Sequence, residues 1–146
     1  MAFKELTQAE IDQVLEAERI MRVGFAADGE SYLVPLGFVT HRGSLYAMTT
    51  KGRKTRMAAI QPKVSFQVDT ASTTGPFSWQ SVTGEGTFEV VTAAPEIEAV
   101  AALLTTRFPD MPAWMQEEYG ERQKRGDVVF VRVRPSKIAG RRSEPA

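Results

Sequence analysis

The fold is decided by residues 32–50, which have the sequence YLVPLGFVTHRGSLYAMTT. Residues 32–40 and 45–49 are extended runs rich in β-branched and aromatic side chains, and each is typical of a strand. The residues between them, His41-Arg42-Gly43-Ser44, are those of a tight turn. Because a turn this short joins only antiparallel neighbours, the stretch predicts a β-hairpin and not a strand–helix–strand unit.

The segments on either side of this hairpin continue the antiparallel pattern. Extended runs at residues 19–28, 64–69, 79–91 and 127–134 predict four further strands. Helices are predicted after the capping box of Thr7 and Glu10, at residues 53–60 and at residues 95–108, with further helix content in residues 109–125. Residues 71–78 are expected to form a loop and residues 141–146 a loose tail. The pattern therefore predicts a mainly β fold with α, a six-stranded antiparallel barrel with flanking helices.

The composition is that of one globular domain covering residues 1–146. Hydrophobic residues make up 42% of the chain and charged residues 25%, both near the average for soluble proteins. The 18 Lys and Arg balance the 18 Asp and Glu, so no global field attracts nucleic acid or an anionic membrane. The chain has no Cys and a single His, His41, which excludes disulfides, zinc fingers, iron–sulfur clusters, thiol nucleophiles and multi-histidine metal sites. We expect no metal site, and we expect His41 to be an exposed turn residue without a catalytic role.

No segment predicts export or insertion into a membrane. Residues 1–18 carry five acids and one Lys, with no apolar stretch of the kind found in a secretory signal. The longest apolar run, residues 99–104, is far shorter than the ~20 residues of a spanning helix. We therefore expect a cytoplasmic protein that makes no membrane contact.

Residues 49–56, with the sequence TTKGRKTR, place four cations where a strand ends and a helix begins. Cations in a first helical turn oppose the helix dipole, at a cost of ~0.3 to 1 kcal/mol each. An anion held by free backbone N–H groups, by the hydroxyls of Thr49 and Thr50, and by Arg53 and Lys54 would offset this cost. The segment predicts a phosphate site, with a solvated charged face as the alternative. A Walker A loop is excluded because its second Gly is absent.

The strand at residues 32–39 is apolar on both of its faces. One face is expected to meet the core, and the other needs an equally dry neighbour, either a helix or a second subunit together with a planar ligand. Pro35 and Gly37 favour the second subunit, because Pro interrupts the strand ladder and Gly permits close approach.

In their order and spacing, these segments resemble the flavin-binding split-barrel proteins related to pyridoxamine 5'-phosphate oxidase. The similarity covers most of the chain and is carried by Val34-Pro35-Leu36, residues 45–50, Gly52-Arg53-Lys54, residues 61–66, Trp79-Gln80-Ser81-Val82 and Gly84-Glu85-Gly86. The resemblance implies a split β-barrel that binds FMN at the interface of a homodimer.

The same resemblance implies which residues contact the cofactor. The residues expected to flank the isoalloxazine ring are Val34, Pro35, Leu36, Met48, Thr49 and Thr50. Those expected to hold the phosphate are Arg53 and Lys54, with Lys51 beside them. Gln80 and Ser81, next to Trp79, are expected to reach a flavin shared with the partner chain, and Trp114 to approach the ring from a neighbouring subunit.

The predicted function is that of an FMN-dependent oxidoreductase that transfers hydride or electrons between the flavin and a small organic substrate. No catalytic side chain is assigned, because a flavin carries out hydride transfer itself. Residues 133–142 lack the Arg-x-His substrate motif of the pyridoxamine phosphate oxidases, so pyridoxamine phosphate is not the expected substrate.

Two alternatives remain. One is a reductase that uses the deazaflavin F420, whose longer charged tail would also suit Lys51, Arg53, Lys54 and Arg56. The other is a non-catalytic module that stores flavin or binds nucleic acid through the basic C-terminal strand. That strand offers a single aromatic residue, Phe130, for base stacking, which favours an oxidoreductase that binds no nucleic acid.

Overall fold

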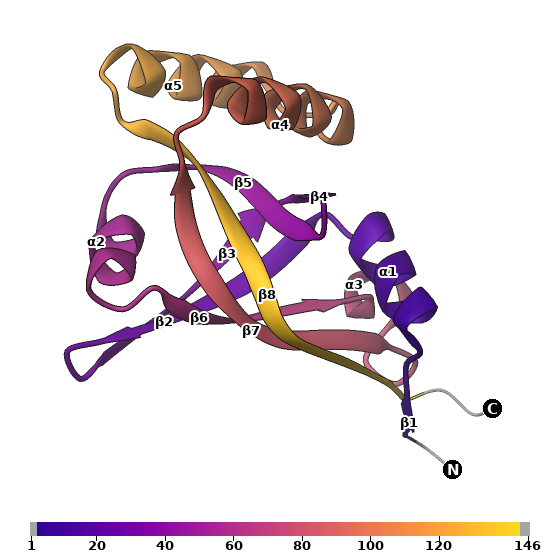
Figure 1. Ribbon diagram of the computed structural model, residues 1–146. Coiled ribbons are helices and arrows are strands. Elements are labelled where there is room, and N and C mark those ends of the chain that lie inside the picture. Colours follow the sequence, from indigo (N-terminus) through magenta and orange to yellow (C-terminus); the bar gives the residue numbers. More distant parts are fainter. Residues whose placement is uncertain (1–2, 144–146) are drawn as a thin grey trace.

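Figure 1 shows the computed structural model, which describes residues 3–143. The strands of this part of the chain are β1 (Lys4–Glu5), β2 (Ile20–Ala27), β3 (Glu30–Gly37), β4 (Val39–His41), β5 (Ser44–Thr50), β6 (Lys63–Asp69), β7 (Gln80–Val91) and β8 (Val128–Arg142). The helices are α1 (Gln8–Ala17), α2 (Arg53–Ile60), α3 (Ala71–Thr74), α4 (Ala94–Arg107) and α5 (Ala113–Lys124). The strands form one sheet in the order β3-β2-β6-β7-β8-β5-β4, with β1 paired to β8.

The sheet curls because its two edge strands, β3 and β4, follow one another in the chain. Only Phe38 separates them, at the corner where the chain passes from one edge of the sheet to the other. The Phe38 ring is fully buried, and the Phe38 N–H donates to the Arg19 carbonyl at 3.0 Å. Both contacts hold the corner in place. Every strand pair is antiparallel, and the helices flank the curved sheet (Figure 1). The predicted class, a mainly β split barrel with flanking helices, is confirmed.

The predicted count of six strands was too low, since the described residues form eight. Residues 32–40, predicted as one strand, are two strands because the chain turns at Gly37 and Phe38. A Cβ at position 37 would lie 2.9 Å from Cζ of Phe108, so a side chain there would collide with the ring that covers the corner. The other additional strand, β1, has two residues, too few to produce a periodic pattern.

The last strand is much longer than predicted. β8 runs to Arg142 because it pairs with the whole of β7, from Phe130 opposite Val91 to Arg142 opposite Gln80. Arg141 and Arg142, predicted to belong to a loose tail, are therefore strand residues, and Arg142 also lies 3.3 Å from the Glu10 carboxylate of α1. Residues 144–146 of the predicted tail lie outside the described residues.

Most helix predictions agree with the structure. The α1 capping box is present: the Thr7 hydroxyl accepts from the Glu10 N–H at 3.2 Å, and the Glu10 carboxylate accepts from the Thr7 N–H at 2.9 Å. α2 spans residues 53–60 as predicted. The predicted loop at residues 71–78 contains the short α3, and much of residues 109–125 is α5.

Within residues 3–143, no helix is both long and apolar enough to cross a membrane.

Two hydrophobic clusters hold the elements together. The main core fills the inside of the curved sheet, where Phe25 meets Phe88 edge to face at a ring distance of 5.0 Å, and it includes the buried faces of α1 and α2. A second, smaller cluster of Val39, Tyr46, Val91 and Val100 attaches α4 to the other side of β4 and β5. This places α2 at one end of the barrel and the α4–α5 pair over another (Figure 1).

Candidate functional site

The N-terminus of α2 presents backbone N–H donors. The Gly52 N–H is already bonded, donating to the Thr55 hydroxyl oxygen at 3.0 Å. The N–H groups of Arg53 and Lys54 lie in the first turn, where a helix provides no acceptor within itself. These two donors, with the positive end of the helix dipole behind them, are arranged to bind a negatively charged group.

Three cations gather around this N-terminus in different environments. The Arg53 guanidinium lies over the Tyr32 ring, 4.3 Å from its centroid, and 3.7 Å from the Glu30 carboxylate. Lys51 is exposed. Lys54 is half-buried and forms no ion pair with any residue in the described part of the chain, and burial lowers the pKa of its ammonium group. Lys54 is thus a partly desolvated cation without a counter-ion, and a bound anion would stabilise its charge.

The predicted ring contacts on β3 point to opposite faces of the sheet. Leu36 is buried in the main core and Val34 packs against it, so both side chains point inward. Pro35 is exposed on the outer face, where it lies opposite Arg22 of β2. One chain therefore presents only part of the predicted set to any single ligand.

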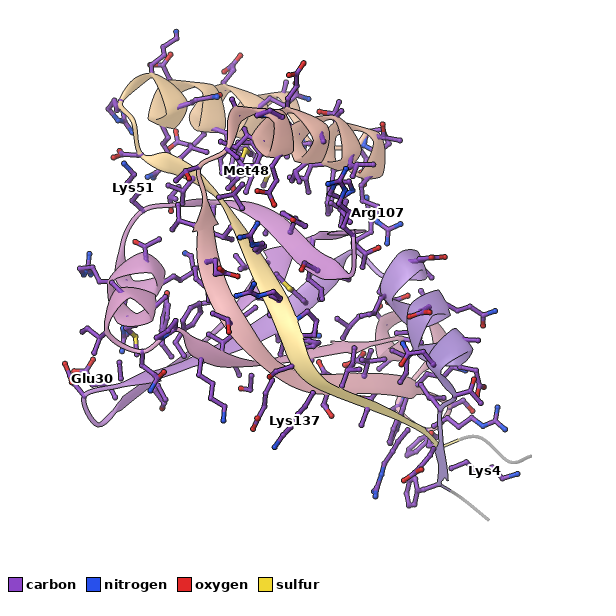
Figure 2. All side chains as sticks on the ribbon, in the orientation of Figure 1. Lys4, Glu30, Met48, Lys51, Arg107 and Lys137 are labelled. Carbon is purple, nitrogen blue, oxygen red and sulfur yellow. The ribbon has the colours of Figure 1, made fainter. Side chains whose placement is uncertain are left out.

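The predicted contacts on β5 are divided in the same way. Thr49 is 4% exposed. Met48 and Thr50, its neighbours in the strand, point to the opposite side of the sheet. Met48 lies opposite Phe130 of β8 and beneath α4 and α5 (Figure 2).

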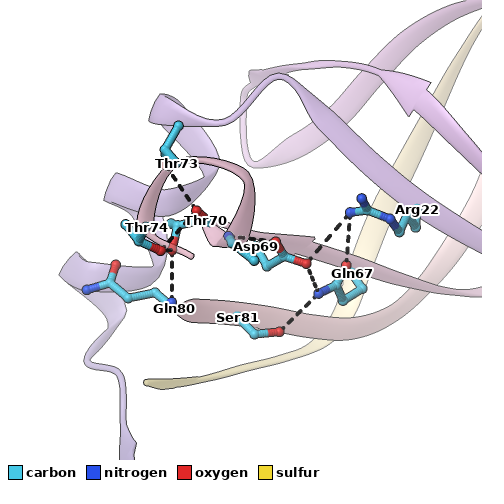
Figure 3. Close-up of polar contacts among 9 residues, drawn as sticks. Arg22, Gln67, Asp69, Thr70, Thr73, Thr74, Gln80 and Ser81 are labelled. Carbon is cyan, nitrogen blue, oxygen red and sulfur yellow. Dashed lines mark hydrogen bonds and ion pairs between the residues drawn. The ribbon is translucent and has the colours of Figure 1, made fainter. Parts of the chain in front are cut away.

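Gln80 and Ser81 begin β7, and the Ser81 side chain lies at one end of a polar network (Figure 3). The Gln67 amide nitrogen donates to the Ser81 hydroxyl oxygen at 3.2 Å and to the Asp69 carboxylate at 2.7 Å. The Arg22 guanidinium donates to the Gln67 amide oxygen at 3.4 Å and lies 3.7 Å from Asp69. Arg22, Gln67 and Asp69 were not predicted as site residues.

A signal for these residues is present in the sequence of β6. The strand alternates polar side chains with apolar ones: Lys63, Ser65, Gln67 and Asp69 against Val64, Phe66 and Val68. This alternation predicts that one face of the strand is polar and exposed to solvent. Which polar side chains meet across that face depends on the register with β2 and β7, which no local pattern specifies.

The two halves of the predicted site lie far apart within one chain. β6 begins at Lys63, just after α2, and Ser81 pairs with Asp69 at the other end of β6. Six residue steps in a strand span about 20 Å. One chain does not bring Ser81 to the cations of α2.

The predicted cofactor residues also lie outside a cavity of this chain. A cavity of about 620 Å³ lies between α1, β4 and α4, and Leu15, Arg19, Val39, Leu103 and Arg107 are among the residues that line it. None of the predicted cofactor residues lines this cavity. Nor do residues 3–143 contain a cluster of acidic or His side chains that could hold a metal ion.

The two tryptophans occupy very different positions. Trp79 is half-buried and stacks with Phe3, with the ring centroids 6.1 Å apart. Trp114 is 65% exposed at the start of α5, a helix in which no residue is buried. The α5 helix therefore presents a large aromatic side chain to its surroundings.

Acidic neighbours match much of the basic charge of β8. Arg132 lies 2.5 Å from the Glu96 carboxylate of α4 and 3.3 Å from Glu89. Glu96 also accepts from the Tyr46 hydroxyl at 2.5 Å. The hydrogen bonds from Tyr46 and Arg132 lower the pKa of Glu96. The pKa of Tyr46 is raised, first by burial and then by its hydrogen bond to Glu96.

His41, predicted to be exposed, is half-buried. Its ring packs edge-on against Tyr46, with the ring centroids 5.7 Å apart.

Comparison with known proteins agrees with this architecture. An FAD-binding protein from Mesorhizobium loti is 25% identical, with a TM-score of 0.76 over 99% of this chain and 100% of that one. An FAD-binding protein from Mycobacterium smegmatis is 23% identical, with a TM-score of 0.69 over 97% and 100% of the two chains. The heme storage protein HutZ from Vibrio cholerae shares the fold at 16% identity and a TM-score of 0.70, over 90% and 92%.

No curated protein matches the sequence. The family model described as pyridoxamine 5'-phosphate oxidase matches residues 7–142, nearly the whole chain. The protein therefore belongs to the pyridoxamine 5'-phosphate oxidase family.

Proposed function

We propose that this protein binds FMN through the N-terminus of α2 and is a flavin-dependent oxidoreductase acting on a small organic molecule. The observation that carries the proposal is Lys54, a half-buried cation with no counter-ion among residues 3–143, next to the first-turn amides and Arg53. A phosphate supplies the missing negative charge and accepts charge-assisted hydrogen bonds. The similarity to the FAD-binding protein from Mesorhizobium loti supports a flavin, because FMN and FAD share a phosphate on the ribityl chain.

The chain's own residues would bind and orient the cofactor. Arg53 and Lys54 would hold the phosphate, with Lys51 at the rim, and Tyr32 keeps the Arg53 guanidinium in place by stacking against it. The backbone of residues 34–36 and 48–50, together with those of their side chains that face outward, would supply the surface for the ring. When bound, the flavin supplies hydride and electron transfer, so no side chain of this protein needs an acid–base role.

A complete site is proposed to need two copies of the chain. The support is the separation of Ser81 from α2 and the exposed outer face of β2 and β3. On that face Leu33 is 70% and Ile20 42% exposed, and Pro35 lies beside them. A symmetric dimer would cover both copies of this face at once and let Gln80 and Ser81 of the partner subunit complete the site.

We expect the protein to sediment as a dimer at micromolar concentration. Replacing Leu33 with Asp should shift it toward the monomer, because a charge would then be buried at the centre of the apolar face. Asp at the exposed position Ala102 of α4 is the matched control and should leave the dimer intact. A monomeric wild type that still binds flavin would exclude the two-copy site.

An absorption spectrum of the purified protein, followed by turnover with an artificial acceptor, tests the proposed function. A yellow protein with bound FMN that reduces a quinone or nitroaromatic would support it. A colourless protein that binds added F420 would point to the deazaflavin alternative. Bound flavin that cannot be reduced and reoxidised with any donor and acceptor would indicate a flavin-binding module without enzymatic activity.

Trp114 is expected to act as a lid over the ring. Because Trp114 is 65% exposed, Trp114→Ala should leave flavin content and melting temperature close to those of the wild type. The KM for a quinone or nitroaromatic acceptor should change several-fold, because the ring would no longer cover the substrate. Steady-state kinetics per bound flavin and thermal denaturation measure the two effects. A large fall in melting temperature with unchanged kinetics would make Trp114 a structural residue.

A further inference from the structure

We propose that Gln67 is a positioning residue that makes the Ser81 hydroxyl a hydrogen-bond donor toward the flavin ring. This inference rests on the proposed flavin function. It assigns a role to Gln67, Asp69 and Arg22, side chains that contact one another on the outer face of β2 and β6 (Figure 3).

The partners of Gln67 allow only one orientation of its amide. Asp69, when ionised, can only accept hydrogen bonds, and the Arg22 guanidinium can only donate them. Gln67 lies between the two, 2.7 Å from the Asp69 carboxylate and 3.4 Å from an Arg22 nitrogen. Its nitrogen must therefore face Asp69 and its oxygen must face Arg22.

The backbone holds Asp69 in this arrangement. One carboxylate oxygen accepts from the Ala71 N–H at 2.9 Å, and the other accepts from Gln67. With both oxygens engaged, the carboxylate cannot rotate away without breaking a hydrogen bond. The orientation of the Gln67 amide is thereby determined by groups attached to two strands and to the start of α3.

The orientation of the Gln67 amide determines which hydrogen bonds Ser81 can make. The second hydrogen of the Gln67 amide nitrogen points to the Ser81 oxygen, 3.2 Å away, so that oxygen acts as an acceptor. A hydroxyl that accepts one bond keeps its own hydrogen for another. Ser81 is half-buried on the outer face and makes no other hydrogen bond with residues 3–143. Its O–H is left to donate to a bound molecule.

The chemistry of the surroundings selects the group that accepts this bond. The Ser81 hydroxyl is a neutral donor, and Arg22, the cation of its network, already pairs with the Asp69 carboxylate and donates to Gln67. The O–H therefore suits an uncharged acceptor, and the carbonyl oxygens of an isoalloxazine ring are of this kind. Ser81 is therefore assigned to the ring and the cations of α2 to the phosphate.

A double-mutant cycle on riboflavin binding tests the assignment. Ser81→Ala should weaken binding roughly three- to tenfold, the factor of one neutral hydrogen bond. Gln67→Met, which keeps the side-chain length but cannot donate, should lose part of that factor. The double variant should bind no more weakly than Ser81→Ala alone, because Gln67 acts through Ser81. Ser65→Ala, on the same face of β6, is the matched control and should bind like the wild type.

Two results would overturn the proposal. One is a loss from Gln67→Met that persists in the Ser81→Ala background, since Gln67 would then act on the fold and not through Ser81. The other is unchanged riboflavin binding in Ser81→Ala. FMN should lose the same factor as riboflavin, because the phosphate is held elsewhere, and a loss confined to FMN would place Ser81 at the phosphate instead.

A measurement on the flavin-free protein separates this proposal from the flavin function. In NMR spectra of the Gln67 side-chain amide, Ser81→Ala should shift one of the two hydrogens and leave the one bonded to Asp69 almost unchanged. If neither hydrogen responds, the Gln67–Ser81 contact is wrong even when FMN binds. If one hydrogen responds but neither FMN nor riboflavin binds, the flavin function is wrong while the orientation of Gln67 stands.

Discussion

Replacing Arg53 and Lys54 together with Ala should weaken FMN binding by roughly a hundredfold or more while leaving riboflavin binding nearly unchanged. A hydrogen bond to a charged group contributes about 1.5–3 kcal/mol, so two such bonds to one phosphate account for a factor of this size. Riboflavin has the same ring and ribityl chain but no phosphate. Titration of both ligands, followed by flavin fluorescence, measures the difference.

The helix offers a matched control for this pair. Arg56 lies one turn further along α2, is exposed, and forms no ion pair within residues 3–143. Arg56→Ala should therefore change FMN affinity by only a few-fold, through the long-range field. An equal loss of FMN and riboflavin affinity in the double variant would mean that Arg53 and Lys54 support the fold and do not bind phosphate. In that case the anion site at α2 would have to be abandoned.

Replacing Gly84 with Ala should lower the free energy of unfolding by about 3 kcal/mol, at the upper end for an overpacked core. Gly84 lies on β7 where β6 and β8 pass close on either side. A Cβ at this position would lie 2.4 Å from the Lys137 carbonyl oxygen and 2.5 Å from Cζ of Phe66. The first contact is with backbone and the second with a buried ring, so neither group can move cheaply. Thermal denaturation should show a melting temperature lower by roughly 6–12 °C.

A second glycine provides a control of opposite sign. Gly120 lies within α5, and a Cβ there would meet no atom within 4 Å. Gly120→Ala should stabilise the protein by about 0.5–1 kcal/mol, because Ala loses less backbone entropy in a helix. If the two substitutions changed the unfolding free energy equally, the close approach at Gly84 would not be the cause.

The sequence alone was sufficient wherever neighbouring residues decide the structure. The α1 capping box depends on Thr7 and Glu10, three residues apart, and α2 ends before Pro62, which disfavours a helical conformation in the residue that precedes it. The cations at residues 51–56 led to the prediction of an anion site because they conflict with the dipole of their own helix, which is also a local property. The order of the motifs was enough to predict the family and the split barrel.

Contacts between distant segments were not predictable in this way. The end of β8, from residue 135 to Arg142, has no regular alternation, and it is a strand only because β7 supplies a partner along its whole length. His41 is half-buried because the hairpin register brings Tyr46 against it. In both cases the structure depends on which residue of another strand lies opposite. A short stretch of sequence does not contain this information, because strand pairing joins residues that are distant in the chain.

For the candidate site, too, some properties follow from the sequence and others only from the tertiary structure. By itself, the sequence determined the local chemistry: a helix that begins with a cluster of cations, a strand with two apolar faces, and polar residues at the start of β7. Only the tertiary structure decided that Lys54 is half-buried with no counter-ion in the described part of the chain, and that Gln67 lies between Asp69, Arg22 and Ser81. It also placed Ser81 and α2 at opposite ends of β6. The physical reason is that charge and hydrogen-bonding capacity belong to single residues, whereas burial and hydrogen-bond partners depend on strand register and sheet curvature.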